Sequence, residues 1–434
     1  MMNKKIKVIG AGLSGCEAAL QLLKRGYTVE LFEMRPKRMT GAHATAEPAE
    51  LVCSNSLKSE EVETASGLLK AELKALGCEL ITIAEGARVA AGGALAVDRS
   101  LFSKLVKDKL FSYDNLIYIN EEVKEVIDET PAIIATGPLT SDSLSDYIKN
   151  ITGDDGFFFF DAIAPIVSAE SIDLSHAFFG GRYGRGGDDY LNLYMNKEEY
   201  DLFYENLIKA ECVKLKDFEG EEVFEGCMPI EVLAKRGKDA IRYGPLRPVG
   251  LRNPETGEKY YAVVQLRKEN TAGNAYNIVG FQTNLTFPEQ KRVFSLIPAL
   301  KNAEFLRYGV MHRNSYVNAP KVLDASFKIK AKENLFIAGQ LSGVEGYVES
   351  IASGLIAALN LDAMLKQAQK IVLPETTIIG ALQRYISSPH EKFQPMNANY
   401  ALLPFIDTDK KKRKKEYYNR SIYDIIKFKE KLPF

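Results

Sequence analysis

The chain has 434 residues, of which 46% are hydrophobic and 26% charged, and its formal net charge at pH 7 is −1. This is the composition of an ordinary globular protein with room for two or three domains, and the near-zero charge excludes a uniformly basic surface, so any RNA-binding surface must be local. The sequence shows no signal peptide and no apolar run of about 18 residues, so we expect a cytoplasmic protein with no membrane partner.

The segment Ile6–Glu33 has the pattern of a dinucleotide-binding turn. An apolar run is followed by three glycines and a helical pattern, and a second apolar run, Val29–Phe32, leads to Glu33. The first glycine permits a tight turn, the second lets the backbone approach a pyrophosphate, and the third lets helix and strand pack closely. The acidic residue about 20 positions later can hold a ribose hydroxyl. The predicted cofactor-binding residues of this segment are Gly10, Ala11, Gly12, Leu13, Ser14, Gly15 and Glu33.

The next part of the chain predicts further elements of a nucleotide-binding domain. Residues 34–48 are polar and irregular, and we expect them to form a loop over the cofactor. Helical patterns follow at 67–76 and 101–109, and short strands are expected at 117–119 and 132–135.

From about Gly156 the apolar runs become aromatic and alternating, with proline and glycine turns between them, which favours a mainly antiparallel sheet. Near Asn334 the first pattern returns as a strand, a glycine turn and a helix. We therefore predict an α/β fold, with a Rossmann-type FAD-binding domain of the two-dinucleotide, glutathione-reductase-like kind and an inserted mixed α+β domain. The expected boundaries are 1–155 and 316–370 for the FAD-binding domain, 156–315 for the insert, and 371–434 for a C-terminal helical tail packed on the FAD-binding domain.

The second glycine segment adds three candidate cofactor-binding residues, Gly339, Gly346 and Tyr347. The helix that starts there could direct its positive N-terminal end toward the pyrimidine end of a flavin. The alternative is a plain strand–turn–helix packed on the sheet.

The five cysteines are an odd and widely scattered set without a CxxC pair. They indicate neither a disulfide framework nor a zinc site, and we expect no bound metal. A lone cysteine is more often a small buried hydrophobic residue than a nucleophile.

Seven sequence blocks carry a resemblance to a known family: VIGAGLSGCEAA, LVCSNSLKS, AGGALAVDR, EGCMPIEVLAKRG, YGPLRPVGL, YGVMHRNSY and FIAGQLSGVEGYVESIASGL. Together they resemble the bacterial folate- and FAD-dependent tRNA (uracil-5-)-methyltransferases, the TrmFO family, over nearly the whole chain to about residue 365. A more distant likeness, mainly in the two glycine segments, is to the RNA-modifying flavoprotein MnmG.

The resemblance implies a methyl transfer that uses 5,10-methylenetetrahydrofolate in place of S-adenosylmethionine. In that family FAD carries the one-carbon unit to carbon 5 of a uridine, usually uridine 54 of the tRNA T-loop, and NADPH or NADH reduces the flavin. Some homologues act on a 23S rRNA uridine, so that target stays open. Two further alternatives are a flavin-dependent NAD(P)H oxidoreductase with no RNA substrate and an RNA-binding protein that holds FAD structurally. We expect a monomer.

The resemblance also assigns roles to two cysteines. Cys227, in EGCMPIEV, matches the nucleophile that attacks carbon 6 of uracil, and Cys53, in LVCSNSLKS, matches a second cysteine that serves as base or helps to open the flavin adduct. The two roles could be exchanged. Lys58 beside the Cys53 motif could lower a thiol pKa, or could be an exposed ion-pair partner.

Folate and RNA contacts are expected at other positions. His312 is the candidate for stacking on a pterin, and Arg313 could bind the glutamyl carboxylate. Arg242, Arg247 and Arg252 are the predicted RNA-binding residues of the insert. The basic run at 410–415 is either a solvated terminus or a further RNA contact.

Overall fold

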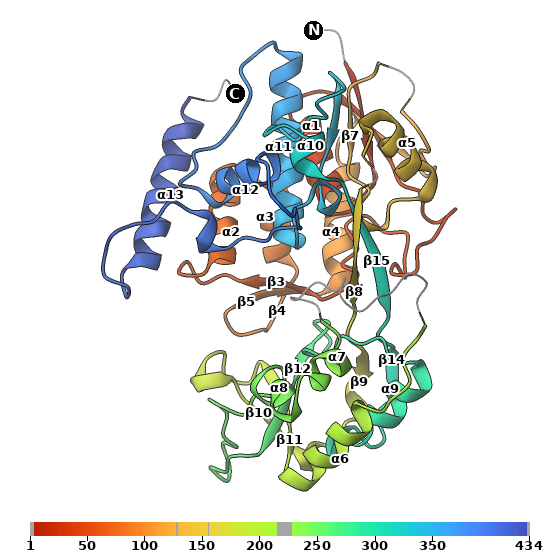
Figure 1. The fold of residues 1–434 in the computed structure, drawn as a ribbon, viewed down its shortest axis with the longest axis vertical. Helices are drawn as coiled ribbons and strands as arrows, with labels where there is room; N and C mark the ends of the chain where they lie inside the picture. Colours follow the sequence, from red (N-terminus) through yellow and green to blue (C-terminus); the bar gives the residue numbers. More distant parts are fainter. Residues whose placement is uncertain (1–3, 127–128, 155, 215–227, 432–434) are drawn as a thin grey trace.

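The computed structural model describes residues 4–126, 129–154, 156–214 and 228–431. Its central element is a five-stranded parallel sheet in the order β16-β7-β1-β2-β6 (Figure 1). The strands are β1 (Lys5–Ile9), β2 (Thr28–Phe32), β6 (Leu116–Ile119), β7 (Ala132–Ile134) and β16 (Leu335–Ile337). All five strands were predicted from their short apolar runs, which suit strands buried on both faces. The predicted Rossmann-type α/β fold is therefore confirmed.

Helices α1 (Leu13–Lys24) and α11 (Tyr347–Leu365) pack against strands of the parallel sheet. The other helices that contribute to the first hydrophobic core here are α2 (Ala65–Ala75), α3 (Glu79–Gly86), α4 (Arg99–Phe111), α5 (Asp142–Thr152) and α10 (Ala319–Val322). A small antiparallel sheet in the order β3-β5-β4 lies beside them, with β3 (Ser56–Ser59), β4 (Arg88–Val89) and β5 (Ala94–Val97). The predicted helices at 67–76 and 101–109 correspond to α2 and α4.

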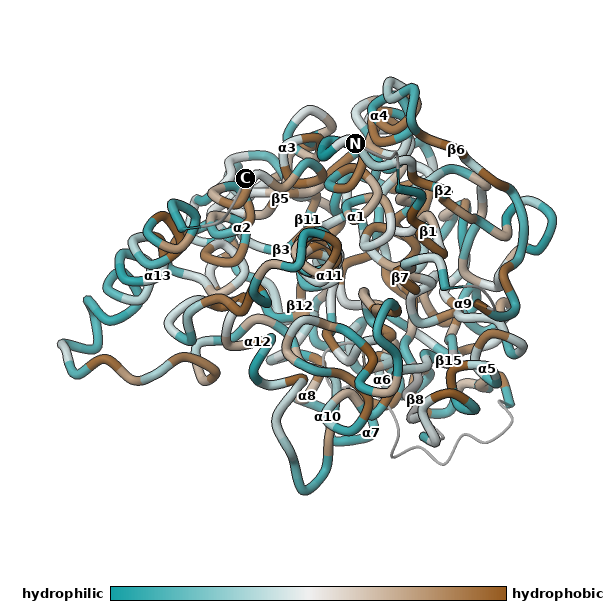
Figure 2. Tube along the Cα trace, turned by 90° about the horizontal axis from the view of Figure 1, so that it is seen from above, coloured by the Kyte–Doolittle hydropathy of each residue, from teal (hydrophilic) through white to brown (hydrophobic). Residues whose placement is uncertain are grey.

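Helix α11 forms the centre of the first hydrophobic core. It is seen nearly end-on in Figure 2, with α1 beside it. Among the described residues it is the one helix that is long and apolar enough to cross a membrane, but 89% of its apolar window is buried inside the protein. A buried helix that is hydrophobic on all sides is expected at the centre of a large core.

The second core lies on a six-stranded antiparallel sheet in the order β10-β11-β12-β13-β9-β14. Its strands are β9 (Ile166–Ser168), β10 (Ala177–Phe179), β11 (Tyr190–Met195), β12 (Ala262–Lys268), β13 (Ala275–Ile278) and β14 (Phe305–Arg307). Its helices are α6 (Lys197–Leu207), α7 (Ile230–Lys235), α8 (Lys238–Tyr243) and α9 (Phe287–Phe294). The antiparallel sheet agrees with the aromatic, alternating runs of the sequence.

Two paired antiparallel strands connect the cores, β8 (Phe157–Ala162) and β15 (Met311–Tyr316), with His312 opposite Asp161 (Figure 1). The chain thus passes into the second core and back again near the expected boundaries at 156 and 315. The boundaries themselves stay predictions.

The C-terminal segment contributes α12 (Ile378–Ser387) and α13 (Arg413–Lys429), which pack on α2 through one buried carboxylate. Glu72 of α2 accepts hydrogen bonds from the backbone N–H groups of Ile378, at 2.7 Å, and Ile379, at 3.0 Å. Its Oε1 also accepts one from the hydroxyl of Ser421 on α13, at 2.5 Å. Glu72 is fully buried, so it completes the N-terminus of α12 and holds α13 at the same time.

We expect Glu72→Ala to lower the free energy of unfolding by about 3 kcal/mol, because it leaves two buried N–H groups and a hydroxyl without acceptors. Urea denaturation followed by circular dichroism measures the loss. Glu85→Ala is the matched control, because Glu85 forms an exposed pair with Lys74 and should change stability by less than about 1 kcal/mol. Equal effects of the two substitutions would contradict the assigned role of Glu72.

The same residue predicts a pH dependence. Burial raises the pKa of Glu72 from 4.5 to about 7, although its three hydrogen bonds oppose the rise. Between these values the unfolded chain releases the proton more readily than the folded one, so the contribution of Glu72 is full below pH 4.5 and is lost as pH rises through 7. The wild type should therefore lose stability between pH 5 and 8 relative to Glu72→Gln.

Candidate active site

Three glycines shape the turn between β1 and α1, and they meet different requirements. Gly10 has a φ of 100°, and a Cβ there would lie 2.6 Å from the carbonyl oxygen of Ala135. A Cβ on Gly15 would lie 1.8 Å from the carbonyl oxygen of Gly10, so packing alone requires glycine at both positions. A Cβ on Gly12 would have no protein atom within 4 Å, although Gly12 lines a cavity. The space beside Gly12 is therefore open to a ligand.

The N-terminus of α1 faces this space. Its N-cap, Gly12, has no side chain to bond the first N–H groups, so these remain available to an anion. The hydroxyl of Ser14 is buried, lines the same cavity and has no hydrogen-bond partner among the described residues. Leu13 lines the cavity as well. An uncapped helix end and an unpaired buried hydroxyl fit the pyrophosphate predicted for this turn.

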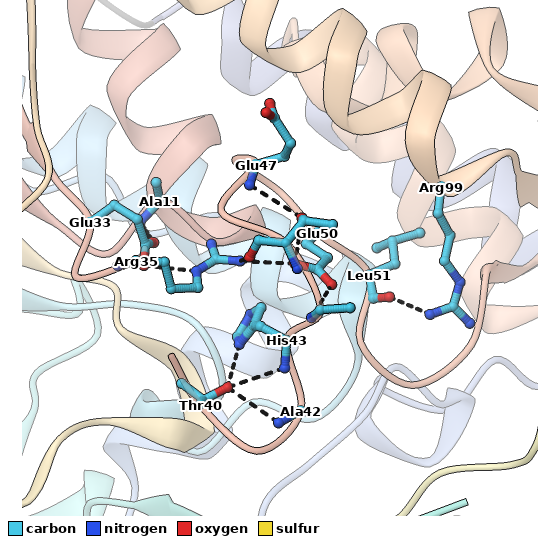
Figure 3. Close-up of polar contacts among 12 residues, drawn as sticks. Ala11, Glu33, Arg35, Thr40, Ala42, His43, Glu47, Glu50, Leu51 and Arg99 are labelled. Carbon is cyan, nitrogen blue, oxygen red and sulfur yellow. Dashed lines mark hydrogen bonds and ion pairs between the residues drawn. The ribbon is translucent and has the colours of Figure 1, made fainter. Parts of the chain in front are cut away.

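The carboxylate of Glu33 lies directly after β2 at the other side of the turn. It accepts hydrogen bonds from the N–H of Ala11 at 3.0 Å and from Nε of Arg35 at 2.9 Å (Figure 3). Burial acts to raise the pKa of Glu33, but the bonds and charge of Arg35 outweigh it and lower the pKa. Arg35 also binds Glu50 at 3.0 Å, so an ion-pair chain holds the loop that follows β2. Glu33 lines a cavity with Gly10 and Gly12, as the ribose-binding role requires.

Three cavities of the first core adjoin one another through shared wall residues, and we call this row of cavities the path. The cavity at Glu33 shares Gly12, Thr136 and Leu139 with the cavity at Ser14. That cavity shares Gln340 and Tyr347, along with Leu139, with a third cavity of about 280 Å³. An elongated ligand could therefore extend from Glu33, past the N-terminus of α1, to the start of α11.

Cys53 lies in the wall of the third cavity. The phenolic oxygen of Tyr347, the first residue of α11, accepts the N–H of Cys53 at 2.7 Å and that of Ser54 at 3.2 Å. Nη2 of Arg99 donates to the carbonyl oxygen of Cys53 at 3.1 Å. Gly346 has a φ of 114°, and a Cβ there would lie 2.3 Å from Oε2 of Glu349. Two predicted sites that are far apart in the sequence, Cys53 and Gly346–Tyr347, thus meet in one cavity.

The Cys53 thiol is surrounded by protein atoms even though the residue is only half-buried. Burial and the negative charge of Asp161 raise its pKa to about 12. Of the two alternatives left open for Lys58, the structure shows the ion pair, because its Nζ lies 3.3 Å from Oε1 of Glu349. At neutral pH Cys53 is therefore a protonated thiol.

Sequence reasoning missed the two carboxylates of the cavity, Asp161 and Glu345. Burial and the charge of Asp161 raise the pKa of Glu345 to about 8, while Nε2 of Gln340 donates to both of its oxygens at 2.9 Å. Glu345 immediately precedes the predicted Gly346–Tyr347 pair, and this position was the available signal. Nothing in the sequence around Asp161 indicated a site residue. It follows an aromatic run, and it reaches the cavity only because β8 pairs with β15 in the folded protein.

The ring of His312 lines the cavity from β15 and rests against Gly41 of the loop after β2. Its Nε2 is buried and has no hydrogen-bond partner among the described residues. Burial, followed by the charge of Arg307, lowers the pKa of His312 to about 4, so the imidazole is neutral at physiological pH. A neutral, flat ring with a free nitrogen fits the stacking role predicted for it, which stays a prediction. The side chain of Arg313 lies outside the described part of the structure.

Cys227 also lies outside the described residues. The motif that contains it continues into α7, where the N–H of Ile230 donates to the carbonyl oxygen of Gln282 at 2.7 Å, and Gln282 lines the cavity of Cys53. In the same motif the buried Glu231 accepts the hydroxyl of Thr283 at 2.8 Å. The described end of the motif is thus anchored beside the cavity.

The three predicted RNA-binding arginines have different environments. Arg242 packs over the ring of Tyr261 at 4.0 Å and donates to the carbonyl oxygen of that residue. Arg247 and Arg252 are exposed. Their role in RNA binding stays a prediction.

The sheet, the glycine turn and the acidic residue after β2 define the protein as one with a Rossmann-type, dinucleotide-binding fold. The family described as glucose inhibited division protein A matches residues 5–369. A crystal structure of Aquifex aeolicus GidA superposes with a TM-score of 0.70 at 16% identity, covering all of this chain and 74% of that chain. At this identity the likeness concerns the fold alone.

Relatives of known name are much more similar in sequence. One from Acetivibrio thermocellus is 53% identical over 421 residues, covering 96% of this chain and 97% of the relative. One from Bacillus subtilis is 51% identical over 429 residues, covering 98% of each. Both are named methylenetetrahydrofolate--tRNA-(uracil-5-)-methyltransferase TrmFO. The chain belongs to the TrmFO family, and the resemblance seen in the sequence blocks is confirmed.

The pKa of Cys53 can be tested through its reactivity. We expect Asp161→Asn to increase the rate of Cys53 alkylation by iodoacetamide between pH 8 and 9 by about 3- to 10-fold, because removal of a negative charge favours the thiolate. Peptide mass spectrometry follows Cys53 separately from the other thiols. The control is Asp146→Asn, an exposed carboxylate on α5 that should change nothing. A lower rate in Asp161→Asn would contradict the electrostatic assignment.

Proposed function

We propose that the protein is a methyltransferase that forms 5-methyluridine at position 54 of the tRNA T-loop, with 5,10-methylenetetrahydrofolate as one-carbon donor, FAD as carrier and NADPH or NADH as electron source. The geometric observation that carries the proposal is the row of three adjoining cavities between Glu33 and Cys53. A dinucleotide cradle that ends at a cysteine and two carboxylates supplies a site for both a redox cofactor and acid–base chemistry. The names of relatives about half identical to this chain support the same activity.

The residues of the path suggest how FAD would be held. Glu33 would bind a ribose hydroxyl, the first N–H groups of α1 with the Ser14 hydroxyl would bind the pyrophosphate, and the start of α11 at Tyr347 would face the flavin ring. When bound, FAD supplies a carrier for the one-carbon unit and for reducing equivalents. The folate pterin would lie in the Cys53 cavity against His312.

The protein side chains would activate the uridine. Uracil carbon 5 is a poor nucleophile until a thiolate adds to carbon 6, and Cys227 is proposed for that addition. A base must later remove the proton from carbon 5 so that the thiol can leave. Cys53 was proposed for this step, but its raised pKa makes it a proton donor at neutral pH in the present conformation. Glu345, whose pKa is about 8, is the alternative acid–base group in the same cavity.

The glycine turn before α1, which we call the cradle, predicts a loss of cofactor binding that can be measured separately from a loss of folding. Gly12→Val should leave the fold intact, because its side chain meets open space, and should reduce FAD retention by at least about 10-fold, because that space is where the pyrophosphate would lie. Circular dichroism measures the fold, and visible absorbance of the purified protein measures bound flavin. Gly15→Ala is the contrasting variant, since its Cβ would overlap the Gly10 carbonyl and should destabilise the protein itself. Full flavin content in folded Gly12→Val would contradict the proposed cradle.

Transfer of label from methylene-labelled folate into RNA tests the activity directly. We expect label in a tRNA transcript and none in a 23S rRNA fragment, no detectable transfer by Cys227→Ala, and a loss of about 100-fold or more for Cys53→Ala. Cys212→Ala is the matched control, because this half-buried cysteine lies outside the cavity. Label in the rRNA fragment alone would show that the substrate is ribosomal RNA and not tRNA. NADPH oxidation without label in either RNA would favour the oxidoreductase alternative.

A further inference from the structure

A second, separate cavity lies in the insert, between the loop 180–189 and the loop 248–260. We call it the glycine-loop pocket. It has a volume of about 690 Å³ and is open to solvent. Aromatic and aliphatic faces make up much of its wall, including Phe179, Tyr183, Val249 and Tyr260. No residue of the proposed active site lines it.

Two tyrosine rings of the pocket lie against neighbouring residues. Tyr183 is 67% exposed, yet it adopts a left-handed φ of 57°, and its N–H donates to the carbonyl oxygen of Gly250 at 2.7 Å. Its ring lies on Gly250, where a Cβ would come within 2.9 Å of it. Tyr260 stacks on Tyr194 with ring centroids 3.9 Å apart and an angle of 8° between the planes. Such rings offer flat apolar surface at little cost in side-chain entropy.

Three arginines lie in or directly beside the two loops, and one of them, Arg252, lines the pocket. Arg182 donates to the side chain of Gln265 at 3.0 Å and to the carbonyl oxygen of Val249 at 2.8 Å. Within the described ranges Arg182, Arg247 and Arg252 form no ion pair with a carboxylate. Burial and the neighbouring charge of Arg247 lower the pKa of Arg182, so the two guanidinium groups repel each other. An anion between them would relieve this repulsion and could accept paired hydrogen bonds.

The loop 180–189 is also linked to the first core and, through strands β11 and β12, to the Cys53 loop. Oδ2 of Asp189 accepts the N–H of Gly92 in the turn between β4 and β5, at 2.5 Å. The next residue, Tyr190, lies opposite Arg267 in the pairing of β11 with β12. Nη2 of Arg267 donates to the hydroxyl of Ser54, the neighbour of Cys53, at 2.8 Å. A ligand in the glycine-loop pocket would therefore be held at a set position relative to the Cys53 loop.

We propose that the glycine-loop pocket binds an unpaired nucleotide of the RNA substrate other than the reacting uridine, with its base against Tyr183 and Tyr260 and its phosphate beside Arg247 and Arg252. Tyr183 is exposed and Tyr260 is half-buried. Aromatic rings next to arginines without a carboxylate partner are the kind of surface on which single-stranded bases stack while cations hold the backbone. One carboxylate, Asp188, lines the pocket and can accept a hydrogen bond from a base amino group. The inference rests on the proposed function in that RNA is the partner.

Binding of a tRNA transcript to the FAD-loaded enzyme tests the pocket. Tyr183→Gly removes the ring, and glycine accepts the left-handed φ without strain. We expect it to weaken binding by about 5- to 100-fold, the range for loss of one stacked base. The matched control is Tyr243→Ala, because Tyr243 is 64% exposed in the same part of the protein but does not line the pocket. It should bind as the wild type does.

A transcript with abasic loop positions separates base stacking from charge. The wild type should bind the abasic transcript more weakly than the intact one. Tyr183→Gly should bind the two transcripts with nearly equal affinity, because it already lacks the stacking ring. Arg252→Gln, which breaks no contact within the described structure, should weaken binding of every RNA equally and reduce the salt dependence by about one ion. In methylation assays Tyr183→Gly should raise KM for tRNA and leave kcat unchanged.

Three results would overturn the proposal. The first is equal affinity of the wild type and Tyr183→Gly for tRNA. The second is a loss of tRNA affinity in Tyr243→Ala as large as that in Tyr183→Gly. The third is a raised KM of Tyr183→Gly for NADPH in RNA-free flavin reduction, which would assign the pocket to the nicotinamide nucleotide. Failure of the proposed function gives a different result. If the wild type transfers no label and Tyr183→Gly still binds tRNA more weakly than the wild type, the methyltransferase assignment is removed and the RNA-binding role of the pocket is supported.

Discussion

The close approach of α11 to α1 is the contact on which the cofactor path depends. A Cβ on Gly354 would lie 2.2 Å from the carbonyl oxygen of Ser14, so the two helices can meet only because this residue of α11 has no side chain. A Cβ on Gly339 would lie 3.2 Å from the Cβ of the same serine, Ser14. These two contacts bring the starts of α1 and α11 to one run of cavities, although more than 300 residues separate them in the chain. A larger residue at Gly354 would push the helix ends apart and break the path between cradle and Cys53.

The second core contributes to the same site through a few polar contacts. Arg267 of β12 binds the side chain of Asn55 at 2.9 Å, and Arg99 forms an ion pair with Glu269 while its guanidinium also donates to backbone carbonyl groups at Leu51 and Cys53. The Cys53 loop is thus held by residues of both cores. Buried arginines suit this position, because a guanidinium can bind several carbonyl and side-chain oxygens at once. The cavity would change shape if the two cores moved relative to each other, which links the insert to the chemistry of the thiol.

Local patterns made much of the first core predictable. The five strands, the helices at α2 and α4, and the glycine turn all follow from short apolar runs, helical spacing and three glycines. Gly12 is an informative case, since its lack of packing neighbours matches the ligand role that its position in the motif predicts. The electrostatics of the site were not predictable in this way. The sequence left open whether a cation lowers the pKa of Cys53, whereas in the structure burial and the charge of Asp161 raise this pKa and outweigh the opposite effect of Arg99. Glu345 and Gln340 were missed because their pairing appears only when the turn before α11 closes.

The sequence by itself determined the fold class, the cradle and the family, because each depends on residues close together in the chain or on blocks shared with relatives. Tertiary structure decided which distant residues meet and what their chemical state is. Burial sets the pKa of Cys53, Glu345 and His312, and burial depends on the whole surrounding structure and not on neighbours in the chain. The glycine-loop pocket has the same origin. Tyr183 and Gly250 are separated by 67 residues in numbering, and only the folded insert places the ring of one on the backbone of the other.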